Sequence, residues 1–217
     1  MDTIEKLTEI FKEFPGIGER QAKRFVYFLM SRSGGYSENL SILISDLKNE
    51  IFQCKECYRF FIPVHNASHS DAGGNKNNKN KICDICSNTN IDESTLMVLE
   101  KDSDLESIKK SKVYHGKYFI IGGLVPIVEK TTKSKVRINE LMEKIKNDSK
   151  KGLTEIILAF SISPQGDHTD FYIKNEIKNL TDSLNIKISS LGRGLSTGTE
   201  LEYSDNDTIK NALKNRQ

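Results

Sequence analysis

The chain has 217 residues, of which 36% are hydrophobic and 29% are charged, and its formal net charge is +2. Its mean hydropathy is −0.49, and no apolar run approaches the roughly 20 residues of a membrane helix, so we expect a soluble protein without membrane contact. The start, MDTIEKLTEI, carries acids where a signal peptide has basic and then apolar residues, which favours a cytoplasmic protein whose four cysteines serve metal or redox roles.

The first fifty residues favour helices separated by a glycine turn. Residues 2–14 place apolar side chains at helical spacing, and Asp2 with Glu5 resembles a capping pair at the helix start. The segment PGIG ends this helix. A second helix is expected over 19–31, and a third over roughly 37–52.

The second expected helix has opposed basic and apolar faces. At about 100° per residue, one face carries Arg20, Lys23 and Arg24. Just before it, Gly16 and Gly18 can take backbone angles closed to other residues, and free amides at the helix start favour an anion. This pattern is typical of a helix-hairpin-helix that holds a nucleic-acid backbone without reading bases. The alternative is an ordinary helical hairpin with a solvated charged face.

Two CxxC knuckles follow the helices, formed by Cys54, Cys57, Cys83 and Cys86. Four thiolates can complete a tetrahedral shell with no open position, so we expect a structural Zn²⁺ in a finger over 53–87. The alternatives are unconnected cysteines or a redox pair. Residues 66–81 are small and polar and are expected to form a mobile loop. His65, just before it, and His69 within it are expected to be solvated; the alternative is that they hold metal.

From Ser94 onward, short apolar runs alternate with helical segments. The expected strands are 95–100, 117–121, 154–160 and 186–190. The expected helices are 104–112, 137–150 and 168–184. This alternation predicts an α/β fold with a parallel sheet covered on both faces. The Gly-rich stretch from Leu191 is expected to form an irregular tail or to pack onto another copy.

An acidic cluster follows the first expected strand. Glu100, Asp102 and Asp104 lie at its carboxyl end, where open parallel sheets gather sites, and such acids suit Mg²⁺. The alternative is a solvated helix start, where acids are favoured in any case. Asp167 follows the third strand, but no DxD pair accompanies it. Two-metal catalysis needs further converging carboxylates, so we expect no enzyme.

Seven segments are distributed in order along nearly the whole chain: FPGIGERQAKRF, CKEC, CDIC, MVLEKDSDLESI, KYFIIGG, EIILAFSISPQGDHTDFYI and LGRGLSTGTELEYSDNDTIKNAL. Together they resemble the RecR family of bacterial recombination mediators. The resemblance implies a helix-hairpin-helix DNA-binding region over 1–52, a C4 zinc finger over 53–87 and a Toprim domain over 93–190. It also implies a C-terminal oligomerisation segment over 191–217 that is exchanged between subunits.

The resemblance further implies a role in DNA repair and recombination. Proteins of this family form a tetrameric ring able to encircle single- or double-stranded DNA, and with RecO-type and RecF-type partners they help to load recombinase onto single strands. The resemblance places Arg20 and Arg24 at DNA-contacting positions, and Glu100 and Asp104 among Toprim acids that serve partner contact. An EGE-type segment of the family is QGD here, ending in Asp167, so one acid is lost. A cytoplasmic, nucleoid-associated bacterial protein is expected.

Three functions follow from these patterns. The first is a non-enzymatic factor that binds DNA independently of sequence. The second is a Mg²⁺-dependent Toprim nuclease or primase-like enzyme, which would use Glu100, Asp102, Asp104 and Asp167; the missing DxD pair argues against it. The third is a zinc-stabilised scaffold that binds only proteins.

Overall fold

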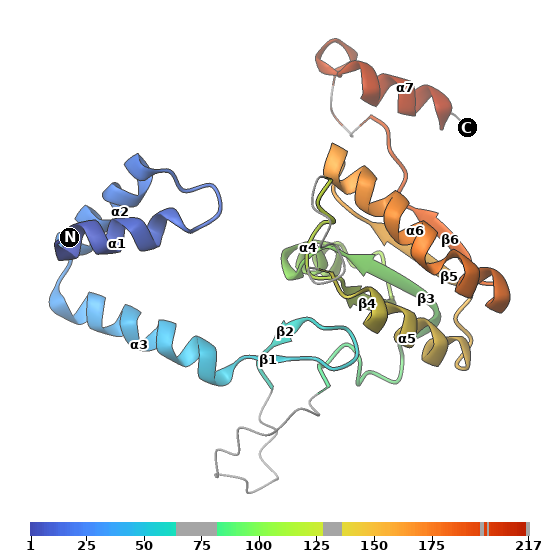
Figure 1. Cartoon of the computed structure of the whole chain (residues 1–217), viewed down its shortest axis with the longest axis horizontal. Coiled ribbons are helices and arrows are strands. Elements are labelled where there is room, and N and C mark those ends of the chain that lie inside the picture. Colours follow the sequence, from blue (N-terminus) through green and yellow to red (C-terminus); the bar gives the residue numbers. More distant parts are fainter. Residues whose placement is uncertain (64–81, 128–135, 196–197, 199, 216–217) are drawn as a thin grey trace, which may run out of the picture. The chain divides into compact units, whose positions relative to one another are not determined.

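The computed structural model describes residues 1–63, 82–127, 136–195, 198 and 200–215. The chain forms two compact units, Met1–Ile51 and Phe52–Gln217, whose elements are drawn in Figure 1. The expected mobile loop at 66–81 and its two histidines lie outside the described residues. Within the described ranges, no helix combines the length and the apolar character needed to cross a membrane.

The first unit is helical. Its helices are α1 (Thr3–Lys12), α2 (Glu19–Met30) and α3 (Gly34–Glu50). The predicted capping pair is confirmed, because the Asp2 carboxylate accepts a hydrogen bond from the Glu5 amide at 2.8 Å and the Glu5 carboxylate accepts one from the Asp2 amide at 3.1 Å. Phe11 of α1 packs edge-on against Phe25 of α2, with ring centroids 5.8 Å apart. The two short helices therefore form a packed hairpin.

The second unit centres on a parallel sheet with strand order β4-β3-β5-β6. Its strands are β3 (Asp92–Leu99), β4 (Gly116–Ile120), β5 (Glu155–Ala159) and β6 (Lys187–Ser190). The helices between them are α4 (Asp102–Ser111), α5 (Ile138–Ser149) and α6 (Pro164–Leu184). The predicted α/β fold is confirmed. α6 begins four residues before its predicted start, because Ser163 caps it and Pro164 occupies its first position.

Helices cover both faces of this sheet. On one face, Ile145 of α5 and Ile177 of α6 pack into a core with buried strand residues. On the other face, Leu105 of α4 packs with strand residues and with Ile85, which lies between two of the cysteines. The cysteine segment includes the short strands β1 (Phe52–Gln53) and β2 (Phe60–Phe61). It attaches to β4, where the Ile120 amide donates a hydrogen bond to the Cys57 carbonyl at 2.8 Å, and Tyr58 packs against both cores.

The residues after β6 end in two short elements, η2 (Leu201–Tyr203) and α7 (Asn206–Lys214). The sequence pattern predicts no helix there. The missed signal is Asp205, whose carboxylate caps α7 by accepting a hydrogen bond from the Thr208 amide at 2.9 Å. α7 buries none of its side chains, although Asn215 after it donates a hydrogen bond to the Arg193 carbonyl at 2.8 Å.

Candidate nucleic-acid interface and metal centre

The turn between α1 and α2 is shaped by Gly16. Its φ of +77° lies in the left-handed region, which favours glycine. Gly18 differs, since its φ of −87° and ψ of 171° are open to any residue, so the expected special backbone angle occurs at Gly16 alone. Gly18 is the N-cap of α2, and the space that a Cβ would occupy there is open.

The start of α2 presents uncapped backbone amides. The Gly18 carbonyl accepts hydrogen bonds from the amides of Gln21 at 3.1 Å and Ala22 at 3.0 Å. The amides of Glu19 and Arg20 have no acceptor within the described part of the chain, and Gly18 has no side chain to supply one. Such amides, at the positive end of the helix dipole, attract an anion.

The two faces of α2 are as predicted. Ala22 and Val26 are buried against the rest of the unit. The exposed side chains on the opposite face are Arg20, Lys23, Arg24 and Tyr27. The predicted basic residues therefore share one solvent-facing surface with the uncapped amides.

The three basic residues of α2 are not equally available. Lys23 Nζ lies 2.6 Å from a carboxylate oxygen of Glu19, and this hydrogen bond lowers the pKa of Glu19. The pair reduces the negative field of Glu19 beside the uncapped amides, but it also occupies Lys23. Arg24 reaches only the Gln21 side chain, at 3.4 Å, and Arg20 has no polar partner among the described residues. Arg20 and Arg24 are thus the cations best placed for an anionic ligand.

The four cysteines converge in the second unit, and their sulfur atoms all lie within 4.8 Å of one another. Cys57 and Cys83, from different knuckles, have sulfurs 3.6 Å apart. The Cys83 amide also donates a hydrogen bond to Cys54 Sγ at 3.4 Å. Three of the cysteines are buried, and Cys86 is partly buried. Four sulfur atoms gathered in this way form the donor set of structural zinc.

The electrostatics of the thiols also fit a bound cation. Hydrogen bonds, the strongest from Cys57, lower the pKa of Cys54 below its usual range. The same interaction with Cys54 raises the pKa of Cys57. Because the sulfurs are this close and largely buried, they cannot all carry negative charge without a positive ion among them. Zn²⁺ bound to four thiolates satisfies this condition and leaves no coordination position for catalysis.

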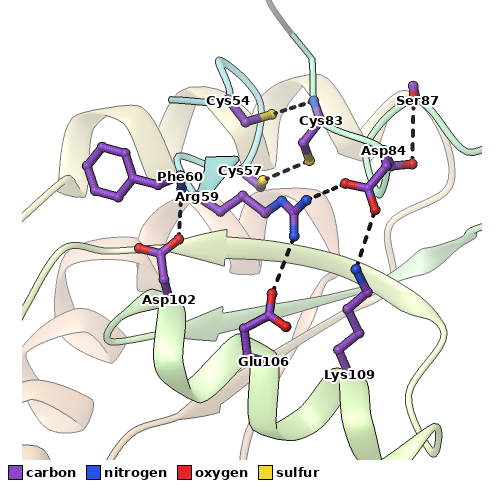
Figure 2. A network of polar contacts seen from close by, with 10 residues as sticks. All are labelled: Cys54, Cys57, Arg59, Phe60, Cys83, Asp84, Ser87, Asp102, Glu106 and Lys109. Carbon is purple, nitrogen blue, oxygen red and sulfur yellow. Dashed lines mark hydrogen bonds and ion pairs between the residues drawn. The ribbon is translucent and has the colours of Figure 1, made fainter. Parts of the chain in front are cut away.

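A polar network attaches the cysteine centre to α4 (Figure 2). Arg59, two residues after Cys57, forms ion pairs with Asp84 and, at 3.7 Å, with Glu106 of α4. Lys109 of α4 reaches the same Asp84 at 3.4 Å. The network thus joins both knuckles to one helix. Sequence patterns could only hint at it, through opposite charges placed directly beside the knuckles.

The acids at the end of β3 take part in contacts within the fold. Asp102 Oδ1 accepts a hydrogen bond from the Phe60 amide at 2.8 Å, as Figure 2 shows. One carboxylate oxygen of Glu100 lies 3.9 Å from Lys101 Nζ. The Asp102 carboxylate therefore attaches β2 to the start of α4 through this hydrogen bond.

The acid after β5 is also engaged. Asp167 forms an ion pair with Arg193, and this hydrogen bond lowers the pKa of Asp167. In the described part of the chain, the cysteines form the only group of three or more His, Cys, Asp or Glu residues arranged to hold a metal. The structure does not gather the four predicted acids into a second such group: Glu100, Asp102, Asp104 and Asp167.

A ladder of alternating charges ties the first knuckle to α5 and to the sheet. Lys117 Nζ lies 3.0 Å from both Glu93 and Asp148. Lys144 Nζ lies 3.0 Å from Asp148 and 3.6 Å from Glu56, which belongs to the first knuckle. Burial by itself lowers the pKa of Lys144, but the charge and hydrogen bond of Asp148, together with other nearby negative groups, outweigh it, and the pKa is raised. The only sequence signal for this ladder was a lysine within otherwise apolar β4 and another on the apolar face of α5.

Comparisons with known proteins cover nearly the whole chain. The Toprim domain model matches residues 94–191, and the model of the C-terminal region of RecR matches residues 194–217. A relative from Dehalococcoides mccartyi named Recombination protein RecR is 33% identical over 214 residues, which span 99% of this chain and 93% of that one. Relatives with the same name from Phocaeicola vulgatus (32% over 213 residues, 98% and 92%) and Lactobacillus acidophilus (33% over 214 residues, 98% and 96%) are similarly close. Since these matches run nearly end to end, the chain belongs to the RecR family of recombination proteins.

Proposed function

We propose that this protein binds the sugar–phosphate backbone of DNA at the start of α2 and acts as a non-enzymatic factor in recombination and repair. The observation that carries the proposal is the uncapped amides of Glu19 and Arg20 on the same exposed surface as the guanidinium groups of Arg20 and Arg24. Phosphate oxygens accept hydrogen bonds from both kinds of donor. Membership of a family of recombination proteins supports the biological role.

Binding of this kind does not depend on base sequence. The groups at the start of α2 are backbone amides and cations that contact phosphates, and phosphate contacts position a protein without reading bases. Gly16 supplies the turn, and Gly18 leaves the approach to the amides open. Lys23 assists by pairing with Glu19, which would otherwise repel a phosphate. Single- and double-stranded DNA both present the required groups.

The remaining modules are assigned supporting roles. We propose that Cys54, Cys57, Cys83 and Cys86 hold a structural Zn²⁺, and that the acids after β3 and β5 contact RecO-type and RecF-type partners during recombinase loading. We also propose that copies of the chain assemble into a tetrameric ring. Contact between copies is supported by α3 and α7, neither of which buries a side chain in the described chain. α3 exposes Ile42, Leu43, Ile44 and Leu47. Apolar surface of this kind favours contact with another copy.

An enzymatic role for the acids has less support. Asp102 accepts the Phe60 amide and Asp167 pairs with Arg193, so two of the four carboxylates are already engaged. A Mg²⁺-dependent nuclease or primase-like activity would need several of these groups to converge on one ion. We therefore assign them to partner contact.

The test is DNA binding by the double variant Arg20→Ala/Arg24→Ala, measured by fluorescence anisotropy with labelled single- and double-stranded DNA over a range of salt concentrations. Loss of two charged hydrogen-bonding groups should weaken binding about tenfold to a hundredfold. The slope of log K against log[salt] should become shallower by roughly two, one unit for each lost phosphate contact.

The matched control is Lys6→Ala/Lys48→Ala, which removes the same charge from exposed positions on α1 and α3. It should bind DNA with nearly wild-type affinity and salt dependence. Both double variants should keep their zinc content and oligomer size. Equal binding by the two double variants would refute the proposal, and dissociation of the oligomer in Arg20→Ala/Arg24→Ala would show that these arginines are structural.

A further inference from the structure

The cysteine centre carries an excess of negative charge when it holds zinc, because four thiolates outweigh one Zn²⁺. Cys54, Cys57 and Cys83 are fully buried, so water cannot stabilise that charge effectively. A buried charge of this size needs a cation nearby. Two cations of the second unit are themselves buried beside the centre: the side chain of Arg59 is 9% exposed and that of Lys144 is 7% exposed.

Lys144 is already neutralised by other groups. It lies 3.0 Å from a carboxylate oxygen of Asp148 and 3.6 Å from one of Glu56. Asp148 is buried with it, since its side chain is only 2% exposed. The positive charge of Lys144 is therefore balanced inside the charge ladder, and little of it remains for the thiolates.

Arg59 is placed differently. Its two carboxylate partners, Asp84 and Glu106, have side chains that are each 55% exposed, so water stabilises much of their charge. The guanidinium lies between the sulfur atoms of Cys57 and Cys83 and helix α4 (Figure 2). Among the described residues, Nε of Arg59 is buried and has no hydrogen-bond partner. The Arg59 guanidinium can therefore provide the thiolates with both a positive charge and a hydrogen-bond donor.

The electrostatics of Arg59 support this arrangement. An arginine remains charged at any pH at which the protein is folded, so its guanidinium can offset the thiolate charge. The group lies beside the sulfur atoms of Cys57 and Cys83, and its buried Nε has no hydrogen-bond partner among the described residues.

We propose that Arg59 is a positioning residue of the zinc centre, which offsets the thiolate charge from outside the ligand shell and holds the finger against α4. Outer groups of this kind orient metal ligands and strengthen metal binding. The inference goes beyond the proposed function, because nothing in it depends on DNA. It rests only on the four cysteines holding zinc.

The position of Arg59 also connects zinc to the acidic end of the sheet. Phe60, the next residue, donates its amide to Asp102 in the first turn of α4, and Arg59 itself pairs with Glu106 one turn further along. When the metal is lost the thiolates take up protons, and the negative charge that holds the guanidinium in place disappears. The first two turns of α4, which carry Asp102, Asp104 and Glu106, are then held less firmly by the Arg59–Phe60 segment.

The test compares Arg59→Gln with Lys55→Gln in the full-length protein. Lys55 lies between the ligands of the first knuckle but is exposed, so this control makes the same change in charge at a solvated position. Zinc affinity is measured by competition with a chromophoric chelator. We expect binding about 10- to 100-fold weaker in Arg59→Gln, the usual cost of losing an outer-sphere partner, and within about twofold of wild type in Lys55→Gln.

The zinc affinity of a third variant, Arg59→Lys, tests whether the positive charge is what matters. Lysine retains the charge, so the affinity should stay within about tenfold of wild type. A larger loss would show that Arg59 does not act through its charge. Hydrogen exchange at the Phe60 amide and in the first turn of α4 should be faster in Arg59→Gln than in Lys55→Gln. Wild-type zinc affinity in Arg59→Gln would overturn the proposal, whereas a wild-type protein that binds no zinc would refute the metal assignment itself.

Discussion

Gly18 illustrates a residue whose missing side chain leaves the first amides of a helix uncapped. Its backbone angles are open to any residue, and the space beside it is empty. Serine or aspartate is usually preferred at the N-cap of a helix, because its side chain accepts hydrogen bonds from the first amides. A cap of that kind would occupy the donors that a phosphate needs, so helix stability and DNA binding make opposite demands here.

We therefore expect Gly18→Asp to keep or slightly raise thermal stability while it weakens DNA binding at least about tenfold. The new carboxylate caps α2, which contributes a few tenths of a kcal/mol, and it repels phosphate at the same position. Gly18→Ser caps without adding charge and should show a smaller loss of affinity. Thermal unfolding and fluorescence anisotropy measure the two effects separately. Undiminished DNA binding by Gly18→Asp would mean that the amides do not contact phosphate.

At the scale of elements, the junction between β5 and α6 depends on a close backbone approach. Ser163 caps α6 and accepts a hydrogen bond from the Gly166 amide at 3.0 Å. A Cβ on Gly166 would overlap the carbonyl oxygen of Ser161, a backbone atom that has little freedom to move. Glycine therefore lets the first turn of α6 fold over the end of the strand.

Gly166→Ala should lower the free energy of unfolding by about 1–3 kcal/mol, the usual cost of forcing extra volume into a packed site. Gly192→Ala is the matched control, since a Cβ there meets open space. It should unfold at nearly the wild-type urea concentration when circular dichroism is followed. Equal midpoints for the two variants would show that the Ser161 turn adjusts freely.

The same elements show what the sequence could predict. The strands and α4 to α6 were predicted within a few residues, because buried strands and amphipathic helices repeat at fixed periods. The start of α6 was placed too late, since Pro164 and Gly166 are common loop residues. α7 was missed because it has only nine residues and follows a Gly-rich stretch, although its apolar residues are at helical spacing.

In the candidate sites too, local sequence patterns were predictable and contacts between distant residues were not. Cysteine spacing predicted the cluster of four sulfur atoms, and the periodicity of α2 predicted its basic face, because both are local patterns. The pairing of Arg59 with Asp84 and Glu106 was not predicted, nor was the ladder around Asp148. These contacts join residues far apart in the sequence, and a single sequence contains no signal that shows which distant residues pair. The use of Asp102 as an acceptor for Phe60 was hidden for the same reason.

At the scale of the whole molecule, the basic surface and the zinc centre belong to different units. The net charge of +2 is too small for the protein to attract DNA as a whole. Binding must then depend on a local arrangement, and the described chain offers one in α2. The acids of the second unit are partly engaged with Phe60 and Arg193. These observations support the proposal that DNA contacts the first unit.

Hydrogen exchange followed by mass spectrometry, on the full-length protein with and without DNA, tests that assignment directly. If the start of α2 binds the backbone, peptides covering residues 16–24 gain protection when DNA is added, and those covering 100–104 and 161–167 do not. Protection confined to the two acidic segments, with the start of α2 unchanged, would contradict it and would favour DNA bound at the Toprim domain.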